Sequence, residues 1–207
     1  AVGSAEVVRI LALLRGFRAF LEGVLLGDTL ESFAALASEA ELRAWGEGRG
    51  GDFPAFLQAA YDLSLEKVGR ASDAFLSYGA YGMFDSGVLH VAGAVDAMEA
   101  GKIVEDTHHA WLVEGPARHP AEGETYVDAD KARAYTWCKA PRYGDRIVET
   151  GALARQVVAG QALARDLVAL HGASVTARVV ARMIELSSVV PAMERWVRAI
   201  VPGEAFC

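Results

Sequence analysis

The sequence predicts a mainly α (α+β) fold, in which a helical bundle carries an irregular, short-stranded β-containing insert. Apolar residues recur every three to four positions in residues 1–71 and again in residues 146–200. Residues 72–145 instead contain aromatic and β-branched residues punctuated by glycine, without that period. We therefore expect a single domain over residues 1–207, with a helical first part, an insert and two long helices at the end.

The first helix is predicted by an apolar stripe from Val7 to about Leu25. Gly16 and Gly23 lie seven residues apart on nearly one face of it. Each glycine costs up to about 1 kcal/mol of helix propensity. We expect the pair to mark a close contact with another helix.

Two more helices are expected before the insert. Asp28 or Thr29 can cap a helix that runs to about Trp45. The glycine-rich stretch at residues 46–52 is a clear break. Asp52, followed by Phe53 and Pro54, then opens a helix to about Gly69.

The insert is expected to contain short strands and turns from Phe75 to Val95, an extended stretch at residues 101–113 and a strand at residues 134–139. From Gly151 the helical pattern returns, Gly172 ends that helix, and Ser174 caps the last one. Pro191 should kink or split this last helix. Its apolar stripe is predicted to consist of Val175, Val179, Met183, Leu186, Val190, Met193 and Val197.

Composition excludes several classes of protein. The net charge of −7 argues against a nucleic-acid binder, which would present a basic face. No apolar run approaches the roughly 20 residues of a membrane span. A secretory signal is not recognisable, which favours the cytoplasm. The chain begins at Ala1 without Met and stops after an apolar helical pattern, so we expect an excised piece of a longer protein.

Candidate metal and nucleophile sites are weak. His108 and His109 are adjacent, and neighbouring residues on a strand point to opposite faces, so they could not easily share one ion. Cys138 and Cys207 form neither a disulfide framework nor a Cys-x-x-Cys pair. We expect Cys138 to be a small packed residue, although Lys139 could lower its thiol pKa. The sequence contains neither a Gly-x-Ser-x-Gly motif nor a phosphate-binding loop.

The densest stretch is "YTWCKAPRYGDRIVETGALAR", residues 135–155, which combines aromatic residues with several cations. Pro141 fixes a corner of the backbone, and Arg142 follows it. Glu149 precedes a helix start, where a negative charge is favourable. We interpret the loop as a polar clamp between strand and helix, in which Arg142 is substantially buried and paired because its guanidinium cannot lose its charge.

This stretch resembles the Lys-Ala-Pro-Arg-Tyr and Glu-x-Gly-Pro-Leu-Ala-Arg segments of the large, catalytic subunit of [NiFe] hydrogenases. Three further stretches, "FLSYGAY", "VEDTHHAW" and "VTARVVARMIE", are similar to family segments in the same order. Together they span residues 75–185. The resemblance implies the middle of a subunit that oxidises H2 reversibly, or senses it, through a Ni–Fe centre.

The departures from the family are as informative. Both Cys-x-x-Cys motifs that hold the Ni–Fe centre are missing, and Ala152 and Ala110 replace the usual Pro and Ser. We therefore expect no catalytic, cofactor-binding or metal-ligating residue in this chain, no cofactor in the segment itself, and no activity of the segment alone. The alternative is an assembly scaffold that resembles the large subunit without its metal ligands. A third reading is a stand-alone helical binding domain.

The resemblance also implies a partner, the iron–sulfur small subunit of the hydrogenase. His109 occupies the place of a family histidine that approaches the iron–sulfur cluster nearest the active site. We expect self-association through helix faces that would be covered in a larger fold. The candidates for facing the partner or for forming the structural clamp are His109, Trp111, Lys139, Arg142, Tyr143, Glu149 and Arg155.

Overall fold

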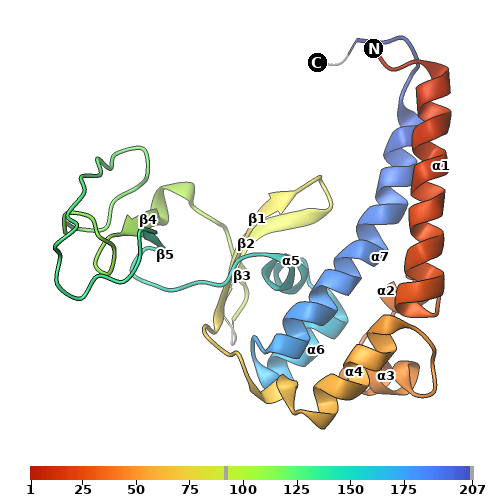
Figure 1. Cartoon of the computed structure of the whole chain (residues 1–207), viewed down its shortest axis with the longest axis horizontal. Coiled ribbons are helices and arrows are strands. Elements are labelled where there is room, and N and C mark those ends of the chain that lie inside the picture. Colours follow the sequence, from red (N-terminus) through yellow and green to blue (C-terminus); the bar gives the residue numbers. More distant parts are fainter. Residues whose placement is uncertain (91–92, 206–207) are drawn as a thin grey trace. The chain divides into compact units, whose positions relative to one another are not determined.

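The computed structural model of the chain describes residues 1–90 and 93–205. Helix accounts for 47% of the residues and strand for 15%, which confirms the mainly α-helical class with a small β component. The chain divides into two compact units, one formed by Ala1–Ala71 with Ala159–Cys207 and the other by Ser72–Val158 (Figure 1).

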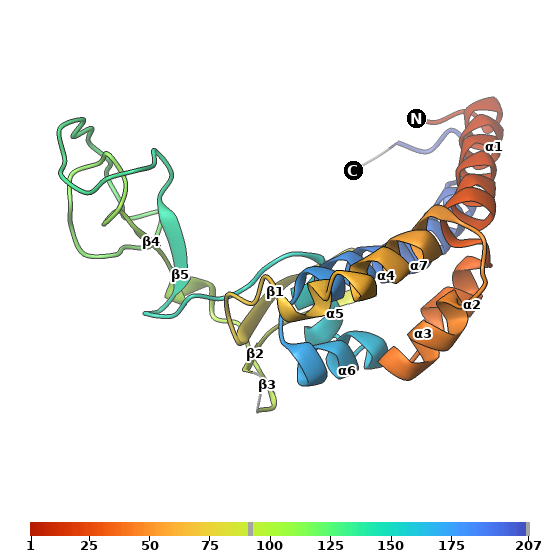
Figure 2. The ribbon, with the colours of Figure 1, turned by 60° about the horizontal axis from the view of Figure 1, so that its bottom comes forward.

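The first unit is helical, and its longest helices, α1 and α7, run side by side (Figures 1 and 2). A π-helical segment, Leu21–Leu26, continues α1 directly. Helix α2 packs against α7 as well, and α6 packs against both α7 and α3. The helices are α1 (Ser4–Phe20), α2 (Leu30–Ala34), α3 (Glu39–Gly46), α4 (Asp52–Asp62), α6 (Ala162–His171) and α7 (Val175–Ala199).

The helix predicted to run to about Trp45 is interrupted. The hydroxyl of Thr29 accepts a hydrogen bond from Ser32 N and caps α2 as predicted, but that helix ends at Ala34. Ser38 starts α3 anew by accepting a bond from Glu41 N. The prediction of one helix as far as Trp45 is therefore wrong, because two capping residues lie within ten positions.

Two other helices are also shorter than predicted, because residues with left-handed backbone angles interrupt them. Helix α4 ends at Asp62 rather than near Gly69, and Ser64 follows with a left-handed φ of 57°. The helix expected from Gly151 to Gly172 is divided into α5 (Ala152–Val158) and α6. Gly160, at φ 80°, breaks it, and the side chain of Gln161 caps α6.

Helix α7 is continuous through Pro191, so the predicted split is wrong. Ser174 caps it as predicted, by accepting a hydrogen bond from Ala177 N. Of the predicted stripe, only Val190 is buried. Small and polar residues form most of the buried face, so the larger residues of the predicted stripe are left partly exposed. The buried residues of α7 are Thr176, Ala177, Val180, Ala181, Ile184, Ser187, Val190 and Ala192.

Three aromatic rings form part of the core of the helical unit. The ring centroids of Phe33 and Trp45 are 5.0 Å apart, and those of Phe33 and Phe53 are 5.5 Å apart, both edge to face. The indole Nε1 of Trp45 donates to Asp28 Oδ2 at 2.9 Å. Burial opposes the ionisation of Asp28, but the bonds from Trp45, Ser32 and the backbone outweigh it and lower the pKa of this carboxyl.

Arg18 joins three segments of the helical unit. Its guanidinium donates to Glu22 at 3.0 Å, to Glu194 on α7 at 3.4 Å and to Glu31 on α2. The hydrogen bond to Glu31 is the main cause that raises the pKa of Arg18 above its usual range, against the opposing effect of burial. Removal of Arg18 would leave three carboxylates without their common cation.

Gly16 of α1 and Gly23 of the π-helical segment do not make the predicted close contact. A Cβ built on Gly16 or Gly23 meets no heavy atom within 4 Å among the residues that the structure describes. Close approach occurs instead at Gly27, where a Cβ would lie 1.8 Å from the carbonyl oxygen of Gly50. Gly27 also has a left-handed φ of 64°. Both the close approach and the backbone angle therefore require glycine at this position.

The second unit begins with a β-hairpin, which lies in the stretch where short strands and turns were predicted. Strands β1 (Ala74–Ala80) and β2 (Phe84–His90) pair antiparallel, and β3 (Val95–Asp96) pairs with β2. Tyr81 and Gly82 turn the hairpin with positive φ angles. Helix α5 packs on β1 and β2, and a Cβ on Gly87 would lie 2.5 Å from the Val95 side chain.

A second, two-stranded sheet pairs β4 (Ile103–Asp106) with β5 (Ala140–Tyr143). The strand was predicted at residues 134–139, and the Ala-Pro-Arg-Tyr segment was interpreted as a rigid corner; both predictions are wrong. Pro141 is tolerated because β5 is an edge strand. Residues 107–139 form loops held by isolated hydrogen bonds, such as Trp111 N to Thr136 O at 2.9 Å.

Candidate functional site: an aromatic surface and a cationic strand

The loops between β4 and β5 gather five aromatic rings, which we call the aromatic surface. Its members are His108, His109, Trp111, Tyr135 and Trp137. The rings of His109 and Tyr135 stack with centroids 5.3 Å apart, and Tyr135 N donates to His109 O at 3.0 Å. His109 and Tyr135 are exposed. The backbone bond therefore fixes a flat pair of rings that faces solvent.

The two tryptophans extend this surface. The rings of Trp111 and Trp137 lie 5.1 Å apart, and 58% of Trp137 is exposed. An exposed tryptophan of this kind leaves much apolar area in water, which is typical of a protein–protein contact. The Nδ1 atom of His108 lies 2.7 Å from Glu114 Oε1.

A buried lysine that was not among the predicted site residues supports the same loops. The side chain of Lys131 is only 8% exposed, and its Nζ donates to the carbonyl oxygens of Thr107 at 2.8 Å and Leu112 at 3.0 Å. A cation that binds two carbonyls on either side of the aromatic surface holds both ends of that loop in place. No spacing or motif around Lys131 indicates this role, because its partners are backbone atoms far along the chain.

The cations of the Lys-Ala-Pro-Arg-Tyr segment are paired with carboxylates of β4. Lys139 Nζ lies 2.6 Å from Glu105 Oε2, and Arg142 lies 3.4 Å from Asp106 Oδ2. The hydroxyl of Tyr143 accepts a hydrogen bond from Glu99 N at 2.9 Å. The sheet register brings these partners together, which explains why an acidic chain concentrates cations in this segment.

The side chain of Arg142 is 23% exposed, which agrees with the predicted burial. It is also paired with a carboxylate, that of Asp106. Its Nη1 donates a second hydrogen bond to the adjacent Pro141 carbonyl at 3.1 Å, which spans no structural junction. The contact with Asp106 does cross from β5 to β4, as a clamp between strands would.

The remaining predicted residues lie at the hairpin. Glu149 pairs through its backbone: Glu149 N donates to Ala74 O and Leu76 N donates to Glu149 O, each at 2.8 Å. Arg155, on α5, has its guanidinium carbon 6.0 Å from the centroid of the Phe84 ring. The predicted single clamp is thus two arrangements within one unit, one at β4–β5 and one at β1–β2.

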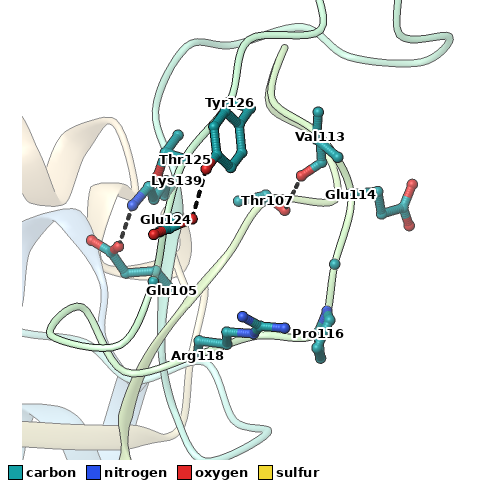
Figure 3. A pocket seen from close by; sticks show the side chains of 12 residues that line it. Glu105, Thr107, Val113, Glu114, Pro116, Arg118, Glu124, Thr125, Tyr126 and Lys139 are labelled. Carbon is teal, nitrogen blue, oxygen red and sulfur yellow. Dashed lines mark hydrogen bonds and ion pairs between the residues drawn. The ribbon is translucent and has the colours of Figure 1, made fainter.

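Two cavities border the cationic segment. A polar one of about 210 Å³ is lined by Lys139, Arg118 and three glutamates (Figure 3). Figure 3 shows the Lys139–Glu105 pair and the Tyr126 hydroxyl bonded to Glu124, a bond that raises the pKa of Tyr126. The other, of about 300 Å³, is more apolar, and both Arg142 and Arg155 line it. Neither lining contains a cysteine or a histidine.

The donor set does not fit a Ni–Fe centre. In residues 1–90 and 93–205, no three His, Cys, Asp or Glu side chains are placed to hold a metal ion. Cys138 is exposed, which makes the prediction of a packed cysteine wrong, and Cys207 lies outside the described residues. A centre bridged by several thiolates therefore finds no ligands in this part of the protein. Nor does any helix of the described part have the length and apolarity to cross a bilayer.

Comparison with known proteins identifies the class. The family model described as nickel-dependent hydrogenase matches residues 1–205. The chain belongs to the nickel-dependent hydrogenase family. This agrees with the resemblance carried by the Lys-Ala-Pro-Arg-Tyr segment and its three companions.

Individual relatives cover the chain to different extents. The solved Ni-Fe-Se hydrogenase from Desulfovibrio vulgaris Hildenborough matches 98% of this chain with a TM-score of 0.71 and 25% identity. The quinone-reactive Ni/Fe-hydrogenase large chain of Wolinella succinogenes is 31% identical across 37% of this chain, and the periplasmic [NiFeSe] hydrogenase large subunit of Desulfomicrobium baculatum is 32% identical across 41%. The chain spans only 42% of the solved Desulfovibrio chain, and 17% and 20% of the two curated relatives align.

Proposed function

We propose that this chain is a middle segment of the large subunit of a nickel-dependent hydrogenase, and that the complete subunit oxidises H2 reversibly or senses it. One observation carries the proposal: nearly the whole chain matches the fold of a hydrogenase, while it accounts for less than half of that relative's length. The segment itself contributes scaffold. The metal ligands come from other parts of the subunit, since the described residues do not supply them.

We further propose that the aromatic surface faces an iron–sulfur small subunit. Support comes from its exposed, backbone-fixed rings, since interfaces are enriched in tryptophan and tyrosine. The pairs Lys139–Glu105 and Arg142–Asp106 brace the strands from which these loops project. In this arrangement His109 and Trp111 meet the partner, and the cationic strand holds them in place.

The parent protein tests the first proposal. The native gene product would be purified under anaerobic conditions with an affinity tag, sized, analysed for nickel and assayed for H2-dependent dye reduction. The proposal requires a polypeptide more than twice as long as the 207-residue chain, because the chain spans 42% of the solved relative. It also requires bound nickel and H2-dependent activity.

The same preparation separates the rival function. An assembly scaffold would be long but free of nickel and inactive with H2, and it would co-purify with another, metal-loaded large subunit. A native product no longer than the present chain would overturn both functions.

The interface is tested with matched variants of the complete subunit. Trp137→Ala should weaken small-subunit binding by about 30-fold or more, the effect of a central interface aromatic. Tyr78→Ala is the control, since Tyr78 is also largely exposed but lies on β1, away from the aromatic surface. Equal binding of both variants would contradict the proposed interface, provided that both unfold like the parent.

A further inference from the structure

One side of α1 exposes large apolar residues, and we call it the outer face of α1. It consists of Leu13, Phe17 and Phe20, with Val24 in the π-helical segment that follows. These residues are between 42% and 65% exposed, whereas Leu14 is the only buried residue of α1. Their spacing of four, three and four places them on one side of the helix. A contiguous apolar stripe of this length on a helix marks a contact surface.

Two glycines, one in α1 and one in the π-helical segment, indicate what kind of element the outer face contacts. Gly16 and Gly23 precede Phe17 and Val24, and the space that a Cβ would occupy at either glycine is open within the described residues. Glycine is the poorest helix former except proline, at about 1 kcal/mol relative to alanine. Small residues beside large apolar ones let a second helix approach closely while its side chains interdigitate.

The flank of α1 beside the outer face packs against this chain. Leu14, three residues before Phe17, and Leu21, which follows in the π-helical segment, are buried there, and Arg18 reaches Glu194 of α7. Figures 1 and 2 both show α7 along one flank of α1. The outer face therefore remains available to an element that does not come from the described residues.

The length of the relatives indicates which polypeptide supplies that element. This chain spans 42% of the solved hydrogenase that matches 98% of it, so more than half of that relative's chain has no counterpart here. We propose that, in the complete large subunit, an apolar helix from the part outside this segment covers the outer face of α1 and crosses it closest at Gly16. This inference rests on the proposed function, because it requires a longer parent chain.

Single cysteines in the complete large subunit and in the isolated 207-residue chain test the inference. Phe17→Cys reports on the outer face, with Val24→Cys as a second variant should the first fail to fold. Arg15→Cys is the control, since Arg15 is an exposed residue on the other side of the same helix. The readout is the rate of labelling by N-ethylmaleimide at that position, measured by mass spectrometry of the corresponding peptide.

The expected result is a difference between the two proteins. Phe17→Cys should be labelled freely in the dilute isolated chain and at least about tenfold more slowly in the large subunit alone, because a covered residue reacts only after local opening. Arg15→Cys should be labelled at similar rates in both. Equal labelling of Phe17→Cys in both proteins would overturn the inference.

Other occupants give different patterns, each of which also overturns it. Protection that rises with the concentration of the isolated chain would mean that a second copy covers the face. Protection that needs the small subunit would assign the face to that partner. A native polypeptide no longer than this chain would contradict both the proposed function and the inference. A longer polypeptide in which Phe17→Cys is labelled freely would contradict the inference alone.

Discussion

Oε2 of Glu39, at the start of α3, lies 2.9 Å from Nε2 of His171, at the end of α6. The same carboxylate accepts two bonds from Arg43, at 3.0 and 2.7 Å, and the Glu39 amide donates to Asp166 Oδ2 of α6 at 2.7 Å. Two short helices that are far apart in sequence are thus joined through one nearly buried glutamate. We call these contacts of Glu39 the joint between α3 and α6. Because the joint involves ionisable groups, its contribution to stability must depend on pH.

Glu39 predicts a loss of stability in acid. Burial opposes its ionisation, but the bonds from His171 and Arg43 outweigh burial and lower the pKa of Glu39. Below the ordinary glutamate pKa of about 4.3 the unfolded chain therefore binds more protons than the folded one. The stabilisation is present above that pH and is lost as the pH falls through the folded pKa. Urea unfolding of Glu39→Gln between about pH 3 and pH 7 should show a weaker acid dependence than the parent.

Glu47→Gln is the control for this experiment. Glu47 is exposed, lies just after α3 and makes no side-chain hydrogen bond within the described residues. Its variant should follow the pH profile of the parent. If Glu39→Gln also follows that profile, the joint between α3 and α6 does not contribute as described.

Arg18→Met should destabilise the chain by about 1–3 kcal/mol, because it leaves Glu22, Glu31 and Glu194 without their shared cation. Methionine keeps the apolar stem, so lost packing contributes little. Arg15→Met changes the same helix at an exposed position and should alter unfolding by less than about 0.5 kcal/mol. The test is to compare the urea midpoints of the two variants, provided that their m-values are equal. Similar midpoints would contradict the proposed contribution of Arg18 to stability.

Gly16→Ala and Gly27→Ala should act in opposite directions in the isolated chain. Alanine at Gly16 meets no atom within 4 Å and should stabilise α1 by up to about 1 kcal/mol. Alanine at Gly27 would place its Cβ 1.8 Å from the Gly50 carbonyl at a left-handed φ, and should destabilise the fold. Thermal unfolding measures both. A destabilising Gly16→Ala in the isolated chain would show that this glycine is already in contact there.

Arg142→Lys should cost less than about 1 kcal/mol, as is usual for partly exposed ion pairs. The sequence predicted a marked loss, but the guanidinium makes one contact across the strands, and this contact is long, at 3.4 Å. Lys102→Ala, at a position that is exposed, should be nearly silent. Urea unfolding of both variants tests this, and a loss of several kcal/mol for Arg142→Lys would restore the interpretation of Arg142 as a tightly buried clamp.

Local signals in the sequence predicted much of the fold. Short strands and turns were predicted from Phe75 to Val95 because aromatic and β-branched residues are punctuated there by glycine, and the caps at Thr29 and Ser174 were predicted from their hydroxyls. The failures have both local and tertiary causes. Glycine at position 160 and a glutamine cap at Gln161 carry only a weak stop signal, and the buried face of α7 is small and polar because another helix lies close to it.

The site was predictable only in part, for a similar reason. The Lys-Ala-Pro-Arg-Tyr segment was identified through its resemblance to a family. Its pairing partners on β4 depend on a strand register that no local pattern specifies. Lys131 and Tyr135 owe their importance to contacts with backbone and ring atoms across the loops, and such contacts leave no mark in the spacing of residues.

The first and last described segments meet at one place, where Gly203 N donates to Val2 O at 2.9 Å. A short flexible linker is therefore long enough to connect residues 2 and 203, so the helical unit meets the geometric condition for circular permutation. It also meets the condition for grafting: the whole segment can be inserted into a surface loop of an unrelated host without separating the host's own flanking residues. Such a chimera would present the two units on a carrier that supplies its own solubility and expression.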